Sequence, residues 1–456
     1  MDLTLTGHHG AVSSLAASPG FSFADPYAIG LVFAGLAVFA AIGALSHQHE
    51  RAFSASLIYL ALGVVAAWII DLLGVGWIDP LRDYALIERL SELAVVIALF
   101  GTGLSLDRRL RTWSWGTSAR LLLVAMPLTV VAVAVLGTLL LGLSLGAAIL
   151  LGAILAPTDP VLAGDLGVGP PGDEEEGEPN FSITAEAGFN DGLAFPIVLL
   201  GVFVAGEGGT GWIVEWLVAD VLYAVACGLV LGLIGGWLIA AAAVRLRDRD
   251  LLSSALDGWL AVAAVLVLYG LTEVAGGYGF LAAFAGGVGF RRYEHEHEVN
   301  GRVHAGAEIV EKFGELALIL LLGSLVTLSS LTEPGVGGWV LVGLLLVVVR
   351  PAAVAVGMVG AEMPLRDRAF MAWFGVRGIG SLYYVAVVLG LGVLGPREAS
   401  ALFWVTAATI VASIVVHGVS ATPLGRVLLE PRREPARPDA EHQGREPEPE
   451  PEPQPA

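Results

Sequence analysis

The sequence predicts an all-α polytopic membrane protein with about 13 transmembrane helices. Of its 456 residues, 56% are hydrophobic and only 15% are charged, whereas a soluble protein carries about 25% charged residues. The mean hydropathy is +0.76, and a water-soluble globule of this size could not bury so much apolar surface. The apolar runs are continuous rather than alternating, which excludes a transmembrane β-barrel.

Thirteen segments approach the length of about 20 mostly apolar residues that a bilayer-spanning helix needs. In chain order they cover residues 27–46, 53–74, 86–105, 118–142, 145–167, 181–206, 213–243, 255–275, 277–290, 308–328, 336–360, 368–394 and 399–421. The ninth segment is short and the seventh is long, so the sequence defines the count to within one span.

Arginine placement indicates which side of the membrane each loop faces. With the N-terminus outside, the inner loops hold clusters such as Arg245, Arg247 and Arg249. The outer loops hold only Arg82, Arg89 and Arg397. This asymmetry follows the positive-inside rule and predicts an odd number of spans with the C-terminus in the cytoplasm.

About half of the net charge of −19 lies in two short stretches. Residues 173–178 carry five acids, and residues 430–456 carry eight acids against four arginines. Such acidity argues against a nucleic-acid partner, because phosphates would be repelled. We expect residues 1–25 to form an extracytoplasmic extension and residues 426–456 to form a disordered, acidic, Pro/Glu-rich cytoplasmic tail.

Five charged residues stand out because their surroundings within the spans are apolar. They are Asp159, Glu186, Asp191, Arg350 and Arg377. A charge near the bilayer centre costs roughly 2.5–3.5 kcal/mol, so each of these residues is a functional candidate.

Asp159 and Thr158 lie between two prolines, Pro157 and Pro160. Because proline lacks an N–H, the carbonyls four residues earlier lose their helical donors. We therefore expect the span to unwind around Thr158 and Asp159. An unwound helix at membrane depth occurs inside protein or beside water, where its free carbonyls can coordinate cations.

Glu186, Asn190 and Asp191 lie on the next span. The spacing of four residues puts Glu186 and Asn190 on one face. Asp191 lies roughly 100° further around the helix, so it can point toward the broken helix while Glu186 points elsewhere. Arg350 follows six apolar residues and needs a carboxylate partner, for which Glu186 is the best candidate.

Arg377 stands among Gly375, Gly378 and Gly380, which favour a second interrupted or tightly crossed helix. There Arg377 would offset carboxylate charge or carbonyl dipoles. The two interrupted spans are the fifth and the twelfth, and this odd offset of seven reverses orientation, as an inverted-topology repeat requires.

Three motifs, in this order, resemble those of the cation:proton antiporter-1 family, the NhaP-like sodium/proton antiporters. They are A-P-T-D-P-V at 156–161, E-A-G-F-N-D at 186–191 and G-V-R-G at 375–378, within a resemblance that covers about residues 27–425. It implies an inverted-repeat antiporter fold in which two unwound helices cross, and a homodimer. It also implies a transmembrane antiporter domain over 26–425. Its core helices span about 118–206 and 336–421, and the remainder forms a dimerisation scaffold and linker.

The resemblance also assigns expected roles to the ion-binding residues. It implies that Asp191 binds both the ion and the proton, with Asp159 and Thr158 beside it as Na⁺ ligands. Asn190 stands where electrogenic relatives carry a second aspartate, which implies electroneutral 1:1 exchange.

Three further residues are matched by the same resemblance. Glu186 and Arg350 match the family's buried structural ion pair, and Arg377 matches its glycine-flanked arginine at the crossed helices. Ala187 departs from the pattern, because many members carry serine directly after this glutamate. If that hydroxyl ligates the cation, one ligand is missing here.

We therefore expect a secondary active transporter, not an enzyme, that exchanges Na⁺, with Li⁺ as a further candidate, for H⁺ without a cofactor. It would reside in the plasma membrane of a prokaryote and serve pH and sodium homeostasis. K⁺/H⁺ exchange is the first alternative, because these residues barely separate Na⁺ from K⁺, and a cation channel is the second. An intramembrane enzyme using Asp159 and Asp191 would leave the buried arginines without a role. His295 and His297 form either a pH sensor or an ordinary charged loop.

Overall fold

A computed structural model describes residues 35–36, 38–39, 55–74, 77–106, 115–159, 177–206, 209–253, 257–293 and 300–429. Within them every regular element is a helix, which confirms the all-α polytopic fold. Several expected features lie outside the described residues: the 1–25 extension, most of the 27–46 span, residues 160–176, His295 and His297, and the tail beyond 429.

The other twelve expected spans each have a helical counterpart in the described residues. The first half contains α2 (Ala55–Leu73), α3 (Tyr84–Ser105), α4 (Gly116–Arg120), α5 (Met126–Leu136), α6 (Leu145–Leu155), α7 (Glu178–Gly206), α8 (Ile213–Glu215) and α9 (Ala224–Arg247). The second half contains α10 (Asp257–Val274), α11 (Gly279–Tyr293), α12 (Asn300–Ser324), α13 (Gly335–Leu344), α14 (Arg350–Gly357), α15 (Leu365–Trp373), α16 (Ile379–Leu391) and α17 (Pro396–Leu429).

Short turns of other helix types join some of these helices into longer spans. They are the π-helical turns η3 (Leu121–Ala125), η4 (Gly137–Leu141), η6 (Trp216–Tyr223) and η9 (Leu345–Val349); a separate 3-10 turn, η8 (Ser330–Thr332), lies between α12 and α13. Counting helices that continue through such turns, seven stretches of the described chain are long and apolar enough to cross a membrane.

Several element boundaries differ from the sequence expectation; α17, for example, continues to Leu429, whereas the expected span ends at 421 and the expected tail begins at 426. The tenth span was expected from 308, but α12 begins at Asn300. The first turns of α12 contain polar residues such as Arg302, so a search for continuous apolar stretches does not include them. Val303 and Ala307 on these turns are nevertheless buried. The span 368–394 is divided into α15 and α16 by five non-helical residues, as its glycines indicated.

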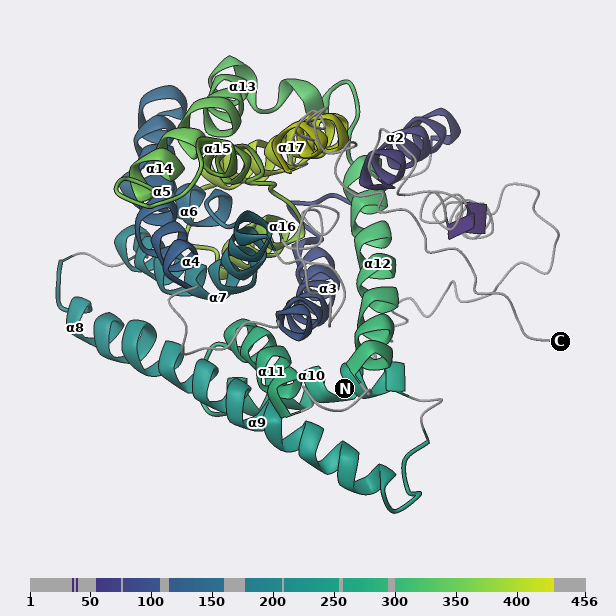
Figure 1. Cartoon of the computed structure of the whole chain (residues 1–456). Coiled ribbons are helices and arrows are strands. Elements are labelled where there is room, and N and C mark those ends of the chain that lie inside the picture. The colour runs from purple at the N-terminus through teal and green to yellow at the C-terminus, as the bar shows by residue number, and fades with distance from the viewer. Residues whose placement is uncertain are drawn as a thin grey trace, which may run out of the picture.

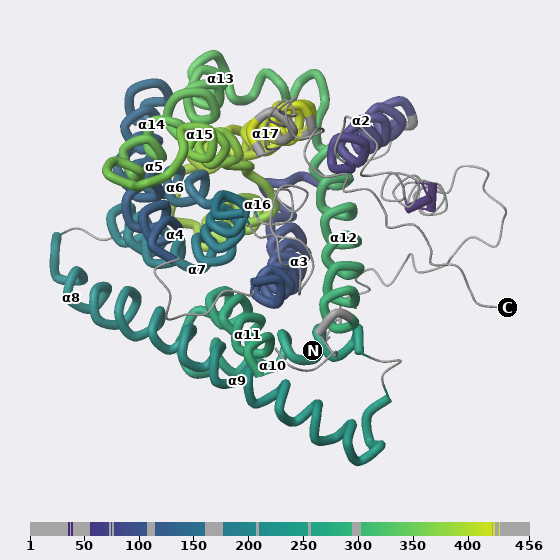
Figure 2. Tube along the Cα trace, in the orientation of Figure 1, coloured from purple at the N-terminus to yellow at the C-terminus, as the bar shows by residue number. Residues whose placement is uncertain are grey.

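The helix α16 lies near the centre of the molecule. It packs against α3, α6, α7 and α17 (Figures 1 and 2). The long helix α12 stands between α2 and α3, and α9 packs along α11 at the far edge of the molecule (Figure 1). The break in the second interrupted span and the first turns of α16 are therefore buried inside protein.

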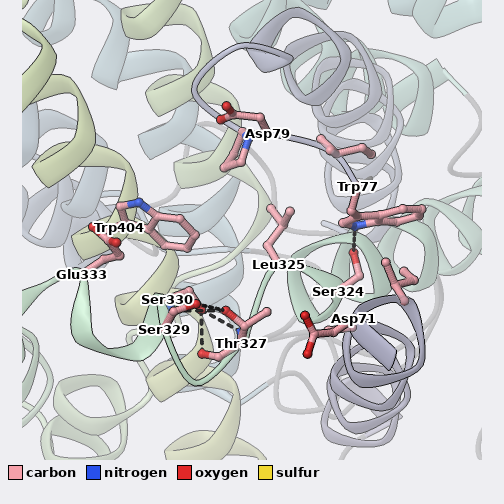
Figure 3. Close-up of a pocket in the computed structure, with 14 residues that line it drawn as sticks. Asp71, Trp77, Asp79, Ser324, Leu325, Thr327, Ser329, Ser330, Glu333 and Trp404 are labelled. Atoms are coloured by element: carbon pink, nitrogen blue, oxygen red, sulfur yellow. Dashed lines mark hydrogen bonds between the residues drawn. The ribbon is translucent and has the colours of Figure 1, made fainter. Parts of the chain in front are cut away.

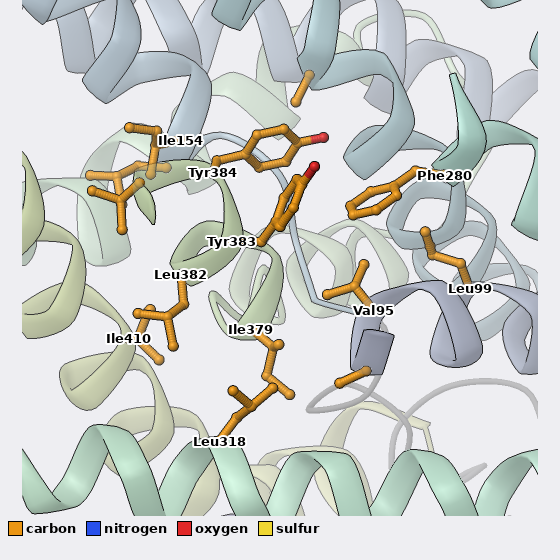
Figure 4. Packing of buried hydrophobic residues seen from close by; sticks show 14 of the residues in the cluster. Val95, Leu99, Ile154, Phe280, Leu318, Ile379, Leu382, Tyr383, Tyr384 and Ile410 are labelled. Carbon is orange, nitrogen blue, oxygen red and sulfur yellow. The ribbon is translucent and has the colours of Figure 1, made fainter. Parts of the chain in front are cut away.

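Apolar side chains from several helices surround α16. Figure 4 shows Ile379, Leu382, Tyr383 and Tyr384 of α16 among residues of the same buried cluster. Those neighbours come from other helices: Val95 and Leu99 of α3, Ile154 of α6, Phe280 of α11, Leu318 of α12 and Ile410 of α17. This packing holds the start of α16 in a fixed place.

Two spans that are seven apart share one backbone irregularity. The π turn η3 ends two residues before Pro127, and η9 ends two residues before Pro351. Proline removes a backbone donor and crowds the preceding turn, and a π turn accommodates both effects. The fourth and eleventh spans thus repeat the offset of seven that relates the two interrupted spans.

Glycines bring α3 and α11 into close contact. A Cβ on Gly287 of α11 would lie 2.2 Å from the carbonyl oxygen of Phe100, and one on Gly103 of α3 would lie 2.2 Å from that of Phe284. Both contacts are with backbone atoms, which cannot rotate away. Any side chain at either position must push the two helices apart.

We expect Gly287→Ala to destabilise the fold by about 1–3 kcal/mol, because over-packing of a close interface forces the backbone to shift. The measurement is thermal unfolding of the purified protein in detergent. Gly270→Ala in α10 is the matched control, since nothing lies within 4 Å of a Cβ at that helical position. Equal melting temperatures for both variants would contradict the close packing.

Candidate functional site

The site is built where the two interrupted spans meet. Residues 156–159 after α6 and residues 374–378 before α16 are not helical. The backbone N–H of Asp159 donates to the carbonyl of Val376 at 2.9 Å, so the two breaks pair directly. Residues 160–167, the other half of the first interrupted span, lie outside the described residues.

Side chains of each break bind the freed backbone of the other. The Asp159 carboxylate accepts from the N–H of Ile379, the first residue of α16. In the opposite direction, Arg377 Nε donates to the carbonyl of Leu155, and Ser381 Oγ donates to that of Ile154 at 2.7 Å. The negative charge of Asp159 therefore lies at the positive end of a helix dipole.

Arg377 is fully buried and lies among carbonyl groups. Besides Leu155, its guanidinium donates to the carbonyl of Gly375 at 2.5 Å. Carbonyl dipoles are one of the two kinds of partner expected for Arg377. Among the described residues, the hydrogen bonds of its guanidinium go to carbonyl groups and not to a carboxylate. Its backbone N–H donates to Ser413 Oγ of α17 at 2.8 Å.

The continuous helix α7 brings a third group of polar residues to the crossing. Asn190 Nδ2 donates to Thr158 Oγ1 at 2.7 Å, which joins α7 to the first break. Asp191 and Asn190 are both 1% exposed. In the described part of the chain, Asp191 Oδ2 and Asn190 Oδ1 have no hydrogen-bond partner.

The side chain of Asp191 lies against the start of α16. A Cβ on Gly380 would be 2.6 Å from Asp191 Oδ1, so only glycine fits there without displacing the carboxylate. The hydroxyl of Tyr384, one turn further along α16, donates to the backbone carbonyl of Asp191. Asp191 thus sits at the same end of α16 as Asp159.

Glu186 and Arg350 form a buried ion pair away from these oxygens. Arg350 Nη1 and Nη2 donate to the two carboxylate oxygens of Glu186 at 2.5 and 2.7 Å. Gly375 makes room for this arginine, because a Cβ there would lie 2.5 Å from Arg350 Nε. The pair joins α7 to α14 through two parallel hydrogen bonds.

Three functional neighbours were missed by reasoning from the sequence. Ser381, Ser413 and Tyr384 bind the breaks or Asp191, as described above, yet each is an ordinary residue of an apolar helix. His417 Nε2 lies 3.0 Å from the carbonyl of Trp373, the last residue of α15. A sequence signal existed on α17, where buried polar residues recur every three or four positions: Thr406, Thr409, Ser413 and His417.

A cavity of about 300 Å³ lies apart from the crossing, near the ends of α2 and α12 (Figure 3). Its lining includes Asp71, Asp79 and Glu333, and Trp77 Nε1 donates to Ser324 Oγ at 2.9 Å. It shares no residue with the ion-binding candidates, which lie in the packed interior.

Comparisons with known proteins place this geometry in context. Residues 26–427 match the family described as sodium/hydrogen exchanger, transmembrane. The chain is 26% identical over 376 residues to the K(+)/H(+) antiporter NhaP of Alkalimonas amylolytica, covering 82% of this chain and 62% of that protein. It is 24% identical over 390 residues to the Na(+)/H(+) antiporter of Saccharomyces cerevisiae, covering 77% and 39%, respectively.

The fold is similar to a solved structure, that of the sodium proton antiporter MjNhaP1 from Methanocaldococcus jannaschii. The TM-score is 0.69 at 18% identity, and the match covers 89% of this chain and 99% of that chain. This similarity confirms the expected antiporter fold. The chain spans less than two thirds of the length of the two curated relatives named above.

We expect Glu186→Gln to destabilise the protein by about 3–5 kcal/mol, because it leaves the buried Arg350 without a counter-charge. The double variant Glu186→Leu/Arg350→Met should recover most of this loss, since apolar replacement of a buried pair is often neutral. Thermal unfolding in detergent compares the two. A Glu186→Gln variant as stable as the wild type would show that the pair contributes little to folding.

Proposed function

We propose that this chain, which belongs to the transmembrane sodium/hydrogen exchanger family, exchanges a monovalent cation for a proton across a membrane. The family is one of transporters, not of enzymes. One observation of the structure carries the proposal: Asp191 is buried beside two crossed helix breaks and keeps a carboxylate oxygen without a partner among the described residues.

Competition for one carboxylate supplies the exchange. Asp191 would hold either a proton or a cation, and Thr158, Asp159 and backbone carbonyls would complete the oxygen shell of the cation. An unloaded Asp191 would carry an uncompensated buried charge, so movement of the empty site is disfavoured. Only the loaded forms would then change sides, which couples the two fluxes.

Alternating access would arise from movement of one bundle against another. In this proposal the core helices, about 118–206 and 336–421, carry the site, and the remainder of the 26–425 domain forms the scaffold of a homodimer. Support comes from α16, α6 and α7, which are joined through the site and lie on one side of α12 (Figure 1). Such rocking around a fixed site is common among transporters with interrupted helices.

We propose Na⁺ as the cation, with K⁺ as the alternative. The solved relative is titled a sodium proton antiporter, whereas the bacterial relative is named a K(+)/H(+) antiporter. Ala187 is buried and supplies no side-chain oxygen, which leaves the K⁺ alternative open. Dye-reported exchange with Na⁺, Li⁺ and K⁺, compared in the same vesicles, decides between them.

We propose a prokaryotic plasma-membrane location, and the arginine asymmetry supports an orientation with a cytoplasmic C-terminus. The arginines of α9 and α11 stand at the ends of their helices, at Arg245, Arg247, Arg291 and Arg292. Both ends face the cytoplasm in the proposed orientation. A role in pH and sodium homeostasis would follow from this location.

We expect Asp191→Asn to abolish exchange, because an amide of similar size neither takes up the proton nor offers a negative charge to the cation. The measurement is Na⁺-dependent proton movement in vesicles that contain the purified protein and a pH dye. Asp248→Asn, at an exposed position just after α9, is the control and should retain activity. Persistent Na⁺-dependent proton movement in Asp191→Asn would refute the mechanism.

We expect the exchange rate to be independent of membrane potential. Asn190 is neutral, so Asp191 alone alternates between one proton and one cation, and no net charge crosses the membrane. Vesicles clamped with K⁺ and valinomycin at several potentials test this with Na⁺ as the substrate. A rate that changes with voltage contradicts 1:1 exchange, and discrete current steps in a planar bilayer would favour a channel instead.

A further inference from the structure

We propose that Glu311 on α12 is a further carboxylate of the transport pathway, which attracts the cation toward Asp159 and Asp191 and strengthens its binding. This inference rests on the exchange function proposed above and deepens it. It adds a residue from a helix outside the two interrupted spans and outside the three motifs.

The packing of α12 turns Glu311 toward the centre of the molecule. Glu311, Glu315 and Leu318 are four and three residues apart, so they share one face of the helix. Glu315 and Leu318 are buried, and Leu318 belongs to the same apolar cluster as Ile379 (Figure 4). Because the N–H of Ile379 binds Asp159, this face of α12 is turned toward the crossing of the interrupted helices.

A glycine on α3 makes room for the Glu311 carboxylate. A Cβ on Gly101 would lie 3.1 Å from Glu311 Oε2, and its next neighbour would be the Cβ of Ala307 at 3.7 Å. Gly101 itself is buried. The charged end of Glu311 therefore lies against the backbone of α3, in space that most residues at position 101 would fill.

Glu311 differs from its neighbour Glu315 in its partners. Glu315 accepts a hydrogen bond from Ser56, and its Oε2 lies 3.7 Å from Lys312 Nζ. Within the part of the chain that the structure describes, no hydrogen bond or ion pair to Glu311 is formed, although the charges of Lys312, Glu315, Glu308 and Asp159 act on it. When it is ionised, this partly buried carboxylate attracts a cation.

The crossing provides the destination for that cation. Asp191 Oδ2 and Asn190 Oδ1 are buried and have no hydrogen-bond partner in the described residues, so oxygens that can ligate a cation are available there. Glu311 stands on a different helix from all of these oxygens. It would raise the local cation concentration beside the site without itself carrying the exchanged proton.

We expect Glu311→Gln to raise the apparent KM for the transported cation about tenfold at unchanged maximal rate, because an attracting charge is lost but Asp191 remains. The assay is the vesicle exchange measurement at fixed pH over a series of Na⁺ and K⁺ concentrations. Glu362→Gln is the matched control, since it removes the same charge from an exposed position between α14 and α15 and should leave KM unchanged.

Wild-type vesicles separate the two proposals. If the wild type shows no exchange, the proposed function is overturned. If the wild type exchanges and Glu311→Gln has the KM of Glu362→Gln, only the inference about Glu311 is overturned. A fall in maximal rate at unchanged KM would overturn it as well, because that pattern indicates a structural role.

Two further variants test whether the charge itself matters. Glu311→Asp keeps the charge on α12 and should retain a KM close to that of the wild type. Gly101→Asp/Glu311→Gln returns a carboxylate to the same space from α3 and should lower KM toward the wild-type value, which repair of packing alone would not do. A KM in Glu311→Asp as high as in Glu311→Gln overturns the proposal.

Discussion

Backbone groups that a helix break sets free in the middle of a membrane must find partners inside the protein, since an unsatisfied group there costs several kcal/mol. Here each break supplies the partners of the other. Asp159 binds the N–H at the start of α16, while Arg377 and Ser381 bind the carbonyls at the end of α6. Neither break finds all of its hydrogen-bond partners within its own span, so the two spans must fold together. The remaining helices surround the crossing with apolar side chains, which makes this pairing necessary.

The same constraint divides three buried carboxylates, Asp159, Glu186 and Asp191, by their partners. Glu186 is bound by Arg350, and Asp159 is bound by the N-terminus of α16. Asp191 stands on the uninterrupted helix α7, which has no freed backbone donors to offer it, and it keeps an oxygen without a partner in the described residues. In the proposed mechanism, the carboxylate that exchanges ligands is therefore the one that the crossing does not need for its own stability.

Hydropathy predicted most of the helices, the prolines around Thr158 and Asp159 predicted the first break, and the glycines around Arg377 predicted the second, because all three signals act locally along the chain. The partners of Arg377 and the part played by Ser381 could not be predicted, since they depend on how two spans more than 200 residues apart in sequence cross. The start of α12 at Asn300 could not be predicted either, because it also depends on packing against other helices. A polar turn can extend a membrane helix when its other face is packed, and a search for apolar stretches then leaves out the polar residues of that turn, such as Arg302.

The π turn before Pro351 has a consequence for the direction of the charge that follows it. A π turn accommodates one additional residue in the helix, which rotates everything beyond it by about 100° relative to an unbroken α-helix. Arg350 is the first residue after η9, and its guanidinium binds Glu186. The residues before η9 and those after it therefore follow different helical phases. An alignment that treats the span as one regular α-helix would assign the wrong face to the lipid either before or after the turn.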